Sequence, residues 1–365
     1  MGEAQDAARS QLLRLQRLDV SRVDWDELDT YADRNVFQTR EWLSFVEKTQ
    51  RAEPVIAEVT QAGETVGFFT GLVVRRYGVR ILGSPLRGWT TGYQGFNLRP
   101  GVSRRDAVAA LPQFAFRTLR CLHIELRDRN LSLDDMDGLG WESSVKTIWE
   151  VDLRRPEEEI FGGMTSACRR CIRKAEKVGV TIEEADDLEF ADDYYAQLRD
   201  VFAKRALVPT YDKARVVELI RHVLPTGRLL LLRARDGDGL CIATGIFPAL
   251  NGRTYFLGGA SWRSHQNLRP NEALMWQAMR QWKARGVEWL DLGSATHRAK
   301  VPGPGPSTGA EYKRKYGPHE VTVPFFWISR FRALSSARNA ASKAIKARQV
   351  ARGRMTAVRS ASRKS

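Results

Sequence analysis

Two cysteines, three positions apart in a strongly basic segment, are the first residues of this sequence that could carry chemistry. Cys168 and Cys171 lie in the stretch SACRRCIRKAEK, which also holds five arginines and lysines. A structural zinc site needs four ligands, usually in two close pairs. The other two cysteines stand alone, and the five histidines never form a close pair. We therefore expect no metal site here and interpret the thiols as small buried side chains.

The basic character of the same segment allows two interpretations. Cys168, Cys171 and Ile172 recur at helical spacing, so the charged residues would form the solvated face of an amphipathic helix. Alternatively, the cluster attracts an anionic substrate, with Arg169 and Arg173 as candidate contacts. For each arginine alone the solvated face is the simpler interpretation. For the cluster as a whole we favour anion attraction.

Length and composition indicate a folded protein of two domains. The chain has 365 residues, 43% of them hydrophobic, and ten tryptophans, which is ample material for packed cores. Four scattered cysteines suit a reducing compartment. No signal-peptide layout and no run of 18 apolar residues is evident. These features predict a cytoplasmic protein.

The net charge of +15 is concentrated at one end of the chain. Residues 329–365 hold eleven lysines and arginines and no acidic residue. We expect a basic helical or disordered tail that binds an anionic surface, either RNA phosphates or lipid head groups. Apolar residues such as Phe331 and Leu334 suit an interfacial helix, so we favour the membrane. The two partners are not exclusive.

The hydrophobic patterns predict two successive sets of elements. Residues 1–20 suggest a weakly patterned leader helix. A helix capped by Thr39 follows within 36–50, then two alternating strands within 54–76. A further strand, a Gly-rich loop, a helix and another strand complete the first set, which closes with extended chain at 141–155.

The second set repeats this order of elements. A basic helix at 165–178 leads to a short strand, two helices and three strands within 227–261. An amphipathic helix at 269–286, a strand at 287–295 and a final strand at 322–328 follow. No residue-level repeat accompanies the shared order. We predict an α+β fold with domains at 1–150 and 151–328, followed by the tail at 329–365.

Four stretches, in this order along the chain, together resemble the FemAB-type aminoacyltransferases. They are VFQTREWLSFVEK, SACRRCIRKAEKVGVTI, RPNEALMWQAMRQWKARGVEWLDLGSA and GAEYKRKYGPHEV, and the resemblance covers residues 35–328. It implies a tandem pair of GNAT-like (N-acetyltransferase-like) domains with mixed, mainly antiparallel sheets. It also implies that the active cleft lies in the second domain.

The resemblance further implies the chemistry. GNAT-type transfer joins an amine to an activated acyl group without a covalent enzyme intermediate or a resident cofactor. Acyl-CoA users bind pyrophosphate with a Gly-containing loop at a helix start. The corresponding stretch here, WRSHQNLRPNEAL, holds no glycine. This agrees with the Fem-like case, in which the donor is aminoacyl-tRNA and the acceptor a peptidoglycan precursor.

Candidate site residues follow from position in the family's motifs. The closing aromatic–Lys pair maps onto Tyr312 and Lys313, where the ammonium group would steady developing negative charge or an acceptor phosphate. Arg205 and Tyr211 lie where family members place acceptor-binding residues. Tyr93, in the Gly-rich loop LRGWTTGYQGF of the first half, could line the acceptor groove or form a turn over the core.

Three further polar residues have simpler interpretations. Asp291, near a strand end, could act as a base, but we interpret it as a structural carboxylate that bonds nearby backbone amides. His265 and His297 titrate near neutrality in principle. As single loop histidines we interpret them as bystanders.

Together these features predict an acyl or aminoacyl transferase. It would act on an amine or hydroxyl of a peptidoglycan, polysaccharide or lipid-linked envelope precursor, with aminoacyl-tRNA as donor. The alternative is an N- or O-acyltransferase of polysaccharide or lipid biosynthesis that uses acyl-CoA or acyl-carrier protein. A further alternative is a non-catalytic RNA- or membrane-binding protein on a GNAT scaffold. We expect peripheral attachment at the inner face of the membrane through residues 329–365.

Overall fold

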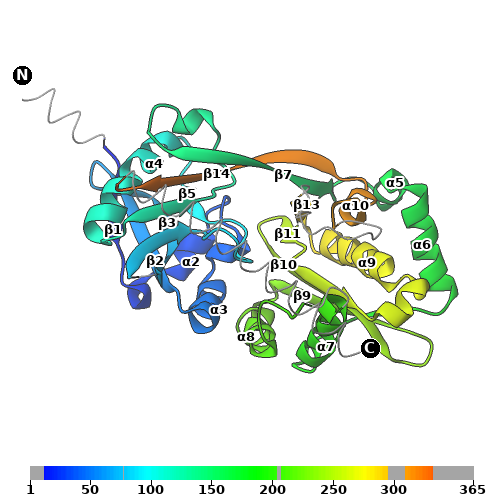
Figure 1. Cartoon of the computed structure of the whole chain (residues 1–365). Helices are drawn as coiled ribbons and strands as arrows, with labels where there is room; N and C mark the ends of the chain where they lie inside the picture. Colours follow the sequence, from blue (N-terminus) through cyan, green and yellow to red (C-terminus); the bar gives the residue numbers. More distant parts are fainter. Residues whose placement is uncertain (1–11, 77, 204–206, 295–308, 332–365) are drawn as a thin grey trace, which may run out of the picture. The chain divides into compact units, whose positions relative to one another are not determined.

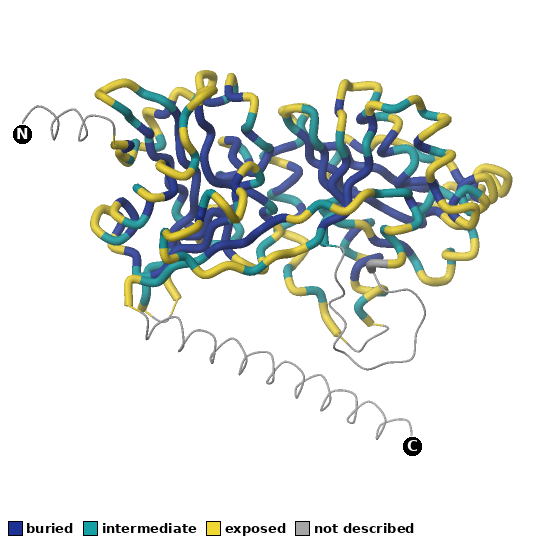
Figure 2. The backbone as a smooth tube through the Cα atoms, turned by 90° about the horizontal axis from the view of Figure 1, so that it is seen from above, coloured by how far each residue is buried: buried dark blue, intermediate teal, exposed yellow. Residues whose placement is uncertain are grey.

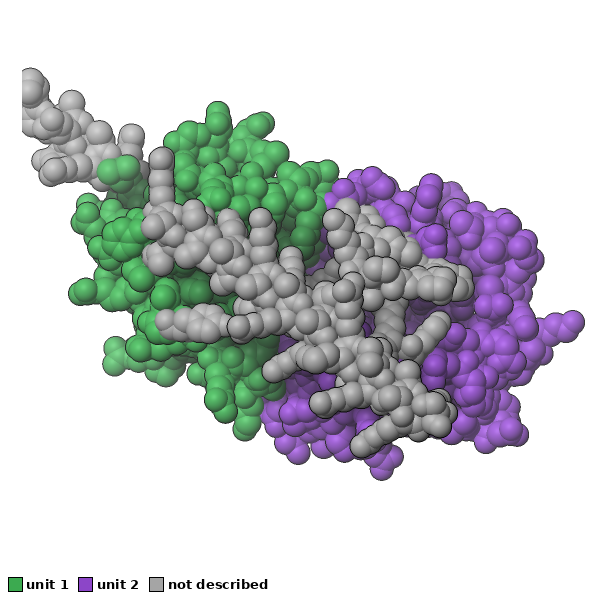
Figure 3. All heavy atoms as spheres, viewed as in Figure 1, with its two compact units in different colours: residues 1–146, 322–337 green, residues 147–321, 338–365 purple. Residues whose placement is uncertain are grey.

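The structure, a computed structural model, describes residues 12–76, 78–203, 207–294 and 309–331. These residues form two units (Figure 3). Unit 1 contains the described residues up to Lys146 and those from Thr322 onward. Unit 2 contains those between Thr147 and Val321.

Unit 1 is built on one mixed sheet. Its strands are β1 (Arg14–Arg17), β2 (Glu53–Gln61), β3 (Glu64–Arg76), β4 (Val79–Ser84), β5 (Gly95–Leu98), β6 (His123–Leu126) and the second part of β14 (His319–Ser329). Successive neighbours β1, β2, β3 and β4 pair antiparallel, β4 pairs parallel with β6, and β6 pairs antiparallel with β14. β5 pairs with the first half of β3, beside the stretch that β4 uses.

Helices cover the sheet of unit 1. They are α2 (Trp25–Asp29), α3 (Arg40–Gln50) and α4 (Arg104–Gln113). The hydroxyl of Thr39 accepts a hydrogen bond from the Trp42 amide at 3.3 Å, so the cap expected from the sequence forms. Trp42 and Phe45 are buried on the inner face of α3.

The leader helix expected over residues 1–20 is wrong for the part that the structure describes. Residues 14–17 form strand β1, which pairs with β2 from Arg14↔Thr60 to Arg17↔Ala57. Leu13 is buried and Leu15 packs on the core. This alternation fits a strand, and pairing with β2 overrides a weak local preference. Residues 1–11 lie outside the described ranges.

Unit 2 contains the remaining strands. They are β7 (Glu142–Asp152, which begins in unit 1), β8 (Thr181–Glu184), β9 (Leu229–Arg235), β10 (Cys241–Leu250), β11 (Arg253–Tyr255), β12 (Gly258–Ser261) and β13 (Trp289–Ser294). Its helices are α5 (Glu157–Gly163), α6 (Ser166–Lys177), α7 (Phe190–Ala203), α8 (Lys213–Val223), α9 (Pro270–Ala284) and α10 (Gly309–Arg314). Figure 1 labels most of these elements and colours them by their position along the chain.

The two units share one strand plan. In unit 2, β8, β9 and β10 pair antiparallel, β10 pairs with both β11 and β12, and β11 pairs parallel with β13. In unit 1, β1, β2 and β3 take the places of β8, β9 and β10. Strands β4 and β5, which both pair with β3, take the places of β11 and β12, and β6 takes that of β13. An antiparallel strand completes each plan: β14 beside β6, and β7 beside β13. The shared element order expected from the sequence is thus confirmed.

The chain exchanges strands between the two plans. β7 follows unit 1 in sequence, but its residues 148–152 pair with β13 of unit 2. Residues 326–329 of β14 follow unit 2 but pair with β6 of unit 1. Each unit therefore obtains its completing strand from the other half of the sequence.

Helices pack on both faces of the unit 2 sheet. The buried core holds residues of α6 and α9, including Cys168, Ile172 and Met275. On the other face, the hydroxyl of Thr244 in β10 donates to Gln197 of α7. Figure 2 shows the buried stretches of the chain, in dark blue, in the interior of the fold. Cys168 is therefore a core residue as expected, whereas Cys171 is only half-buried.

We expect the thiols to differ sharply in reactivity. Burial raises the pKa of Cys121 to about 11 and that of Cys168 and Cys241 to about 12, so the reactive thiolate is scarce at pH 8. Titration of the native protein with a thiol reagent should modify Cys171 alone quickly. All four should react in denaturant. Rapid reaction of three or four thiols in the native protein would contradict this assignment.

Gly317 should be far less tolerant of alanine than other turn glycines. Its φ is +69°, and an added Cβ would overlap the backbone carbonyl of Gly163. Gly227 has a similar φ of +70° with nothing within 4 Å of an added Cβ. Gly227→Ala should cost about 1–2 kcal/mol of unfolding free energy, the ordinary penalty of that backbone region. Gly317→Ala should cost at least about 1 kcal/mol more, measured by urea unfolding, because backbone must move. Equal costs would show that the Gly163 contact is absent.

Candidate functional site

The most distinctive feature of unit 2 is the point where two neighbouring strands separate. Residues Arg253–Tyr255 of β11 pair parallel with Trp289–Asp291 of β13. The Phe256 amide then donates to the Asp291 carbonyl at 2.9 Å. Beyond that bond the chain continues as β12, whose pairing partner among the described strands is β10. The sheet therefore opens between β12 and β13.

Two backbone amides of β12 face this opening. Trp262 N donates to Ile242 O directly opposite it, and the register runs without a shift to Ile246↔Gly258. Alternate residues of an antiparallel strand bond the same neighbour. The N–H groups of Gly258 and Ala260 therefore point to β10, and those of Gly259 and Ser261 point to the opening.

Unit 1 fills the equivalent opening with its own carboxylates. Arg99 N donates to Val66 O, so the N–H groups of Phe96 and Leu98 in β5 point away from β3. Phe96 N donates to Asp128 Oδ2 at 2.9 Å, and Leu98 N donates to Asp33 Oδ2 at 3.2 Å. Arg104 pairs with both carboxylates. Side chains of unit 1 thus bind the amides whose counterparts in unit 2 face the opening.

The expected residue Tyr312 contacts α9 on one side of the opening. Its hydroxyl donates to the carbonyl of Asn271 at 3.2 Å, and Asn271 Nδ2 donates to Ser261 Oγ of β12 at 2.9 Å. Next to it, the ammonium group of Lys315 pairs with Glu272 at 2.6 Å and lies 4.0 Å from the Tyr312 ring centroid. These contacts attach α10 to the start of α9 and, through Asn271, to β12.

Lys313 reaches the end of β13. Its Nζ is 3.5 Å from the Ser294 carbonyl oxygen and 3.4 Å from where a Cβ on Gly293 would stand. Burial lowers the pKa of Lys313, and the charge of Asp291 opposes that shift. Asp291 Oδ1 accepts from the Gly293 amide at 2.6 Å, which is the structural bond expected of it. Lys313 therefore places a half-buried positive charge beside the opening.

Tyr211 is linked to β12 through a second tyrosine, on the face of the sheet that α7 covers. Its hydroxyl lies 2.8 Å from that of Tyr194 in α7. The Tyr194 hydroxyl lies 2.7 Å from where a Cβ on Gly258 would stand. Gly258 begins β12, so a phenol hydroxyl rests against the strand at the opening. The guanidinium carbon of Arg215 lies 5.2 Å from the Tyr211 ring centroid.

Arg169 and Arg173 of α6 contact α5 and the residue that follows it. Arg169 donates to the carbonyls of Gly162, at 2.6 Å, and Met164. Arg173 stacks 5.4 Å from the Phe161 ring centroid. The start of α6 also meets the segment after α10, because Thr165 N donates to Lys315 O at 2.9 Å. A substrate-binding role for Arg169 and Arg173 stays a prediction.

Two other expected site residues stand apart from this group. Tyr93 belongs to unit 1, where it is buried against Phe37 with Arg127 and Arg129 over its ring. Arg205 lies outside the described residues, as do His297 and the tail from 332 onward. Their roles stay predictions.

Several residues at the opening were missed by the sequence analysis. Tyr194, Ser261 and Asn271 carry polar atoms there, but each lies in an ordinary helix or strand pattern. One usable signal existed: the pair Gly258–Gly259 interrupts a strand, and glycine in a strand often marks a close backbone approach.

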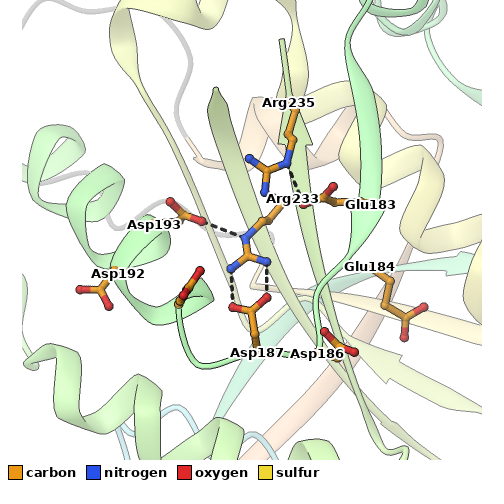
Figure 4. Close-up of a pocket in the computed structure, with 9 residues that line it drawn as sticks. Glu183, Glu184, Asp186, Asp187, Asp192, Asp193, Arg233 and Arg235 are labelled. Atoms are coloured by element: carbon orange, nitrogen blue, oxygen red, sulfur yellow. Dashed lines mark hydrogen bonds and ion pairs between the residues drawn. The ribbon is translucent and has the colours of Figure 1, made fainter. Parts of the chain in front are cut away.

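A cavity of roughly 670 Å³ lies elsewhere in unit 2 and is strongly acidic (Figure 4). Its lining residues are Glu183, Glu184, Asp186, Asp187, Glu189, Asp192, Asp193, Arg233 and Arg235. Arg233 is buried and pairs with Asp187 at 2.6 Å and Asp193 at 2.8 Å. Because Asp193 precedes Tyr194, this ion-pair cluster fixes the start of α7 on β9. We assign it a structural role.

Within the described ranges, no helix combines the length and apolar character that crossing a bilayer requires.

Comparisons with known proteins agree with this geometry. Residues 164–314 match the family model described as the acetyltransferase (GNAT) domain, of the FemAB type. No curated protein sequence matches the chain. The crystal structure of FemX matches with a TM-score of 0.67 at 12% identity, covering 85% of this chain and 96% of FemX.

Two further solved structures share the fold. One is the C-terminal DUF2156 domain of an Agrobacterium fabrum protein described as a lysylphosphatidylglycerol synthetase, with a TM-score of 0.52 at 13% identity over 76% of this chain and 85% of that one. The other is a tandem GNAT protein from the clavulanic acid biosynthesis pathway, with a TM-score of 0.50 at 12% identity over 87% and 98%. The expected α+β, tandem GNAT-like fold is confirmed. Residues 164–314 thus match the acetyltransferase (GNAT) domain family, and the expected assignment as an acyltransferase is confirmed.

Proposed function

We propose that this protein transfers an aminoacyl group from aminoacyl-tRNA to an amine or hydroxyl of a cell-envelope precursor, at the opening between β12 and β13. The observation that supports this proposal most directly is a contrast between the two units. Unit 1 binds the opening-facing amides of β5 with Asp33 and Asp128, whereas the corresponding amides of β12, those of Gly259 and Ser261, point to the opening. As part of this proposal, we retain the domain boundaries expected near residue 150 and at residue 328.

In this mechanism the opening holds the carbonyl of the acyl donor. An amide N–H of β12 donates to the carbonyl oxygen, and the ammonium of Lys313 stabilises the negative charge that grows as the acceptor attacks. Such donors are effective because they are already oriented before reaction. Tyr312 acts indirectly, since its bond to Asn271 holds α10 and therefore Lys313 in place.

The start of α9 favours a donor other than acyl-CoA. A helix N-terminus binds pyrophosphate when its first amides and a Gly-rich loop are accessible. Here the loop is a turn of 3-10 helix (Arg263–Leu268), and Arg269 rather than glycine adopts a positive φ of 65° before Pro270. The carboxylate of Glu272 already occupies the first turn, paired with Lys315. An incoming pyrophosphate would meet that negative charge.

The fold neighbours support the envelope acceptor. FemX shares the fold over most of its length, and so does a domain described as a lysylphosphatidylglycerol synthetase. The second candidate is an acyl-CoA or acyl-carrier-protein dependent N- or O-acyltransferase, which the acetyltransferase description of the family favours. Attachment of residues 329–365 to tRNA or to the inner membrane face stays a prediction.

The donor can be tested directly. Purified protein is incubated with an extract of envelope precursors and one of two labelled donors: bulk tRNA charged with radioactive amino acids, or radioactive acetyl-CoA. We expect label from charged tRNA in a product that resists ribonuclease and mild base. Label transferred from acetyl-CoA alone would favour the second candidate and contradict the proposed donor.

Lys313→Met should lower the transfer rate about 100- to 1,000-fold, the usual cost of one transition-state donor. Folding should be unchanged by circular dichroism. Lys213→Met is the matched control, because Lys213 pairs with Asp192 at the surface of the same unit, and its rate should be unaffected. A Lys313→Met enzyme of full activity would exclude a catalytic lysine.

The transfer rate should fall at alkaline pH, and the charge of Asp291 should set the pH at which it falls. Burial lowers the pKa of Lys313 below the ordinary 10.5, so its ammonium form is lost as pH rises through that lowered pKa. Asp291 raises the pKa of Lys313, so Asp291→Asn should move the falling limb of the pH–rate profile to lower pH. Asn retains the oxygen that accepts from Gly293. Asp238→Asn, in an exposed hairpin, should leave the profile in place; a profile equally insensitive to Asp291→Asn would contradict the assignment.

A further inference from the structure

The hydroxyl groups of Tyr194 and Tyr211 form a pair beside the opening, and no sequence motif predicted that the two residues act together. Tyr194 is 2% exposed and stacks on Phe190 of the same helix. Its hydroxyl stands over the α-carbon of Gly258, with the phenol carbon Cζ 3.6 Å from the Cβ position and the oxygen 2.7 Å from it. The side chain is therefore positioned by packing, and its oxygen requires glycine at 258.

A count of hydrogens shows that the pair has donor capacity left. Each phenol carries one O–H hydrogen and can also accept. A mutual bond of 2.8 Å uses one hydrogen. Among the residues that the structure describes, neither hydroxyl makes another hydrogen bond. The second hydrogen is therefore available to an oxygen atom that arrives at the opening.

The surroundings make the pair a donor rather than a base. Burial raises the pKa of both Tyr194 and Tyr211, so both phenols are neutral at physiological pH. Arg215, whose guanidinium stacks over the Tyr211 ring, places positive charge beside the pair. A nearby cation withdraws electron density from a phenol and strengthens its O–H as a donor.

We propose that the Tyr194–Tyr211 pair donates a hydrogen bond to the carbonyl oxygen of the acyl donor at the Gly258–Gly259 end of β12. This rests on the proposed function and adds a second donor to the amide of Gly259, which belongs to the next residue of the strand. The ligand class is an ester-activated acyl group, whose oxygen becomes negatively charged during transfer.

The step is balanced without a further reactant. The acceptor nitrogen forms a C–N bond to the carbonyl carbon, and the C=O electron pair moves to the oxygen that the pair binds. Re-formation of C=O breaks the C–O bond to the donor's ribose. That ribose oxygen takes the proton that the nitrogen loses. The tyrosines keep their protons throughout and stabilise the intermediate charge.

The kinetic test uses the charged-tRNA assay on the full chain. Tyr194→Phe should lower the maximal transfer rate about 10- to 100-fold and leave the tRNA concentration for half-maximal rate unchanged. Tyr194→Phe with Tyr211→Phe should be no slower than the slower single variant, because the two hydroxyls act as one unit. Tyr31→Phe, a buried tyrosine of unit 1, is the control for the stability cost of losing a hydroxyl.

A geometric test separates this role from general destabilisation. Gly258→Ala should lower the maximal rate as Tyr194→Phe does, because the new Cβ displaces the Tyr194 oxygen. In the Tyr194→Phe background, Gly258→Ala should cost nothing further, since the ring carbon lies at an ordinary 3.6 Å. A full maximal rate for Tyr194→Phe, or an equal loss from Gly258→Ala in both backgrounds, would overturn the inference.

Measuring the same set of variants distinguishes a failure of the proposed function from a failure of the proposed role of the Tyr194–Tyr211 pair. If Lys313→Met is slow and Tyr194→Phe is normal, the hydroxyl pair has no catalytic role and the proposed function stands. If the unmodified protein transfers label from neither charged tRNA nor acetyl-CoA, both proposals fail together.

Discussion

The hydrogen bond from the Phe256 amide to the Asp291 carbonyl is the constraint on which the second unit's chemistry depends. It is the last backbone bond between β11 and β13. One residue beyond it, the strand continues beside β10, its partner among the described strands. A sheet that stayed closed would pair the amides of Gly259 and Ser261 with another strand. Because it opens, no strand among the described residues pairs with those polar groups, and backbone donors in such positions are rarely left unused.

The two units meet this constraint in opposite ways. In unit 1 the donors of Phe96 and Leu98 receive carboxylates that Arg104 holds in place. Three charged side chains thereby complete a self-contained network. In unit 2 the corresponding strand begins with two glycines. The absence of a side chain at Gly258 leaves space for the Tyr194 hydroxyl on one face.

Positioning in unit 2 depends on contacts distant from the opening itself. The Arg233 cluster fixes the start of α7 and therefore Tyr194. The Lys315–Glu272 pair, with the close passage of Gly317 past Gly163, fixes α10 and therefore Lys313. Among the described residues, the Lys313 side chain makes one hydrogen bond, to the Ser294 carbonyl at 3.5 Å, so the packing of α10 sets its position. Rigid supports of this kind are what a pre-organised site requires.

The sequence by itself determined most of the elements and the resemblance to the FemAB-type family. Helix α3 and its Thr39 cap, the amphipathic α9 and the basic α6 follow from periodicity and capping, which are local properties. Position in the closing motif pointed to Lys313. Only the tertiary structure decided that β1 is a strand, that β7 and β14 exchange between units, and that Tyr194 contacts Gly258. Each of these depends on pairing between residues far apart in sequence, whose energy no local pattern carries. Apart from the Gly258–Gly259 pair, the opening left no signal in the sequence, because a strand that separates from its neighbour has the same composition as one that remains paired.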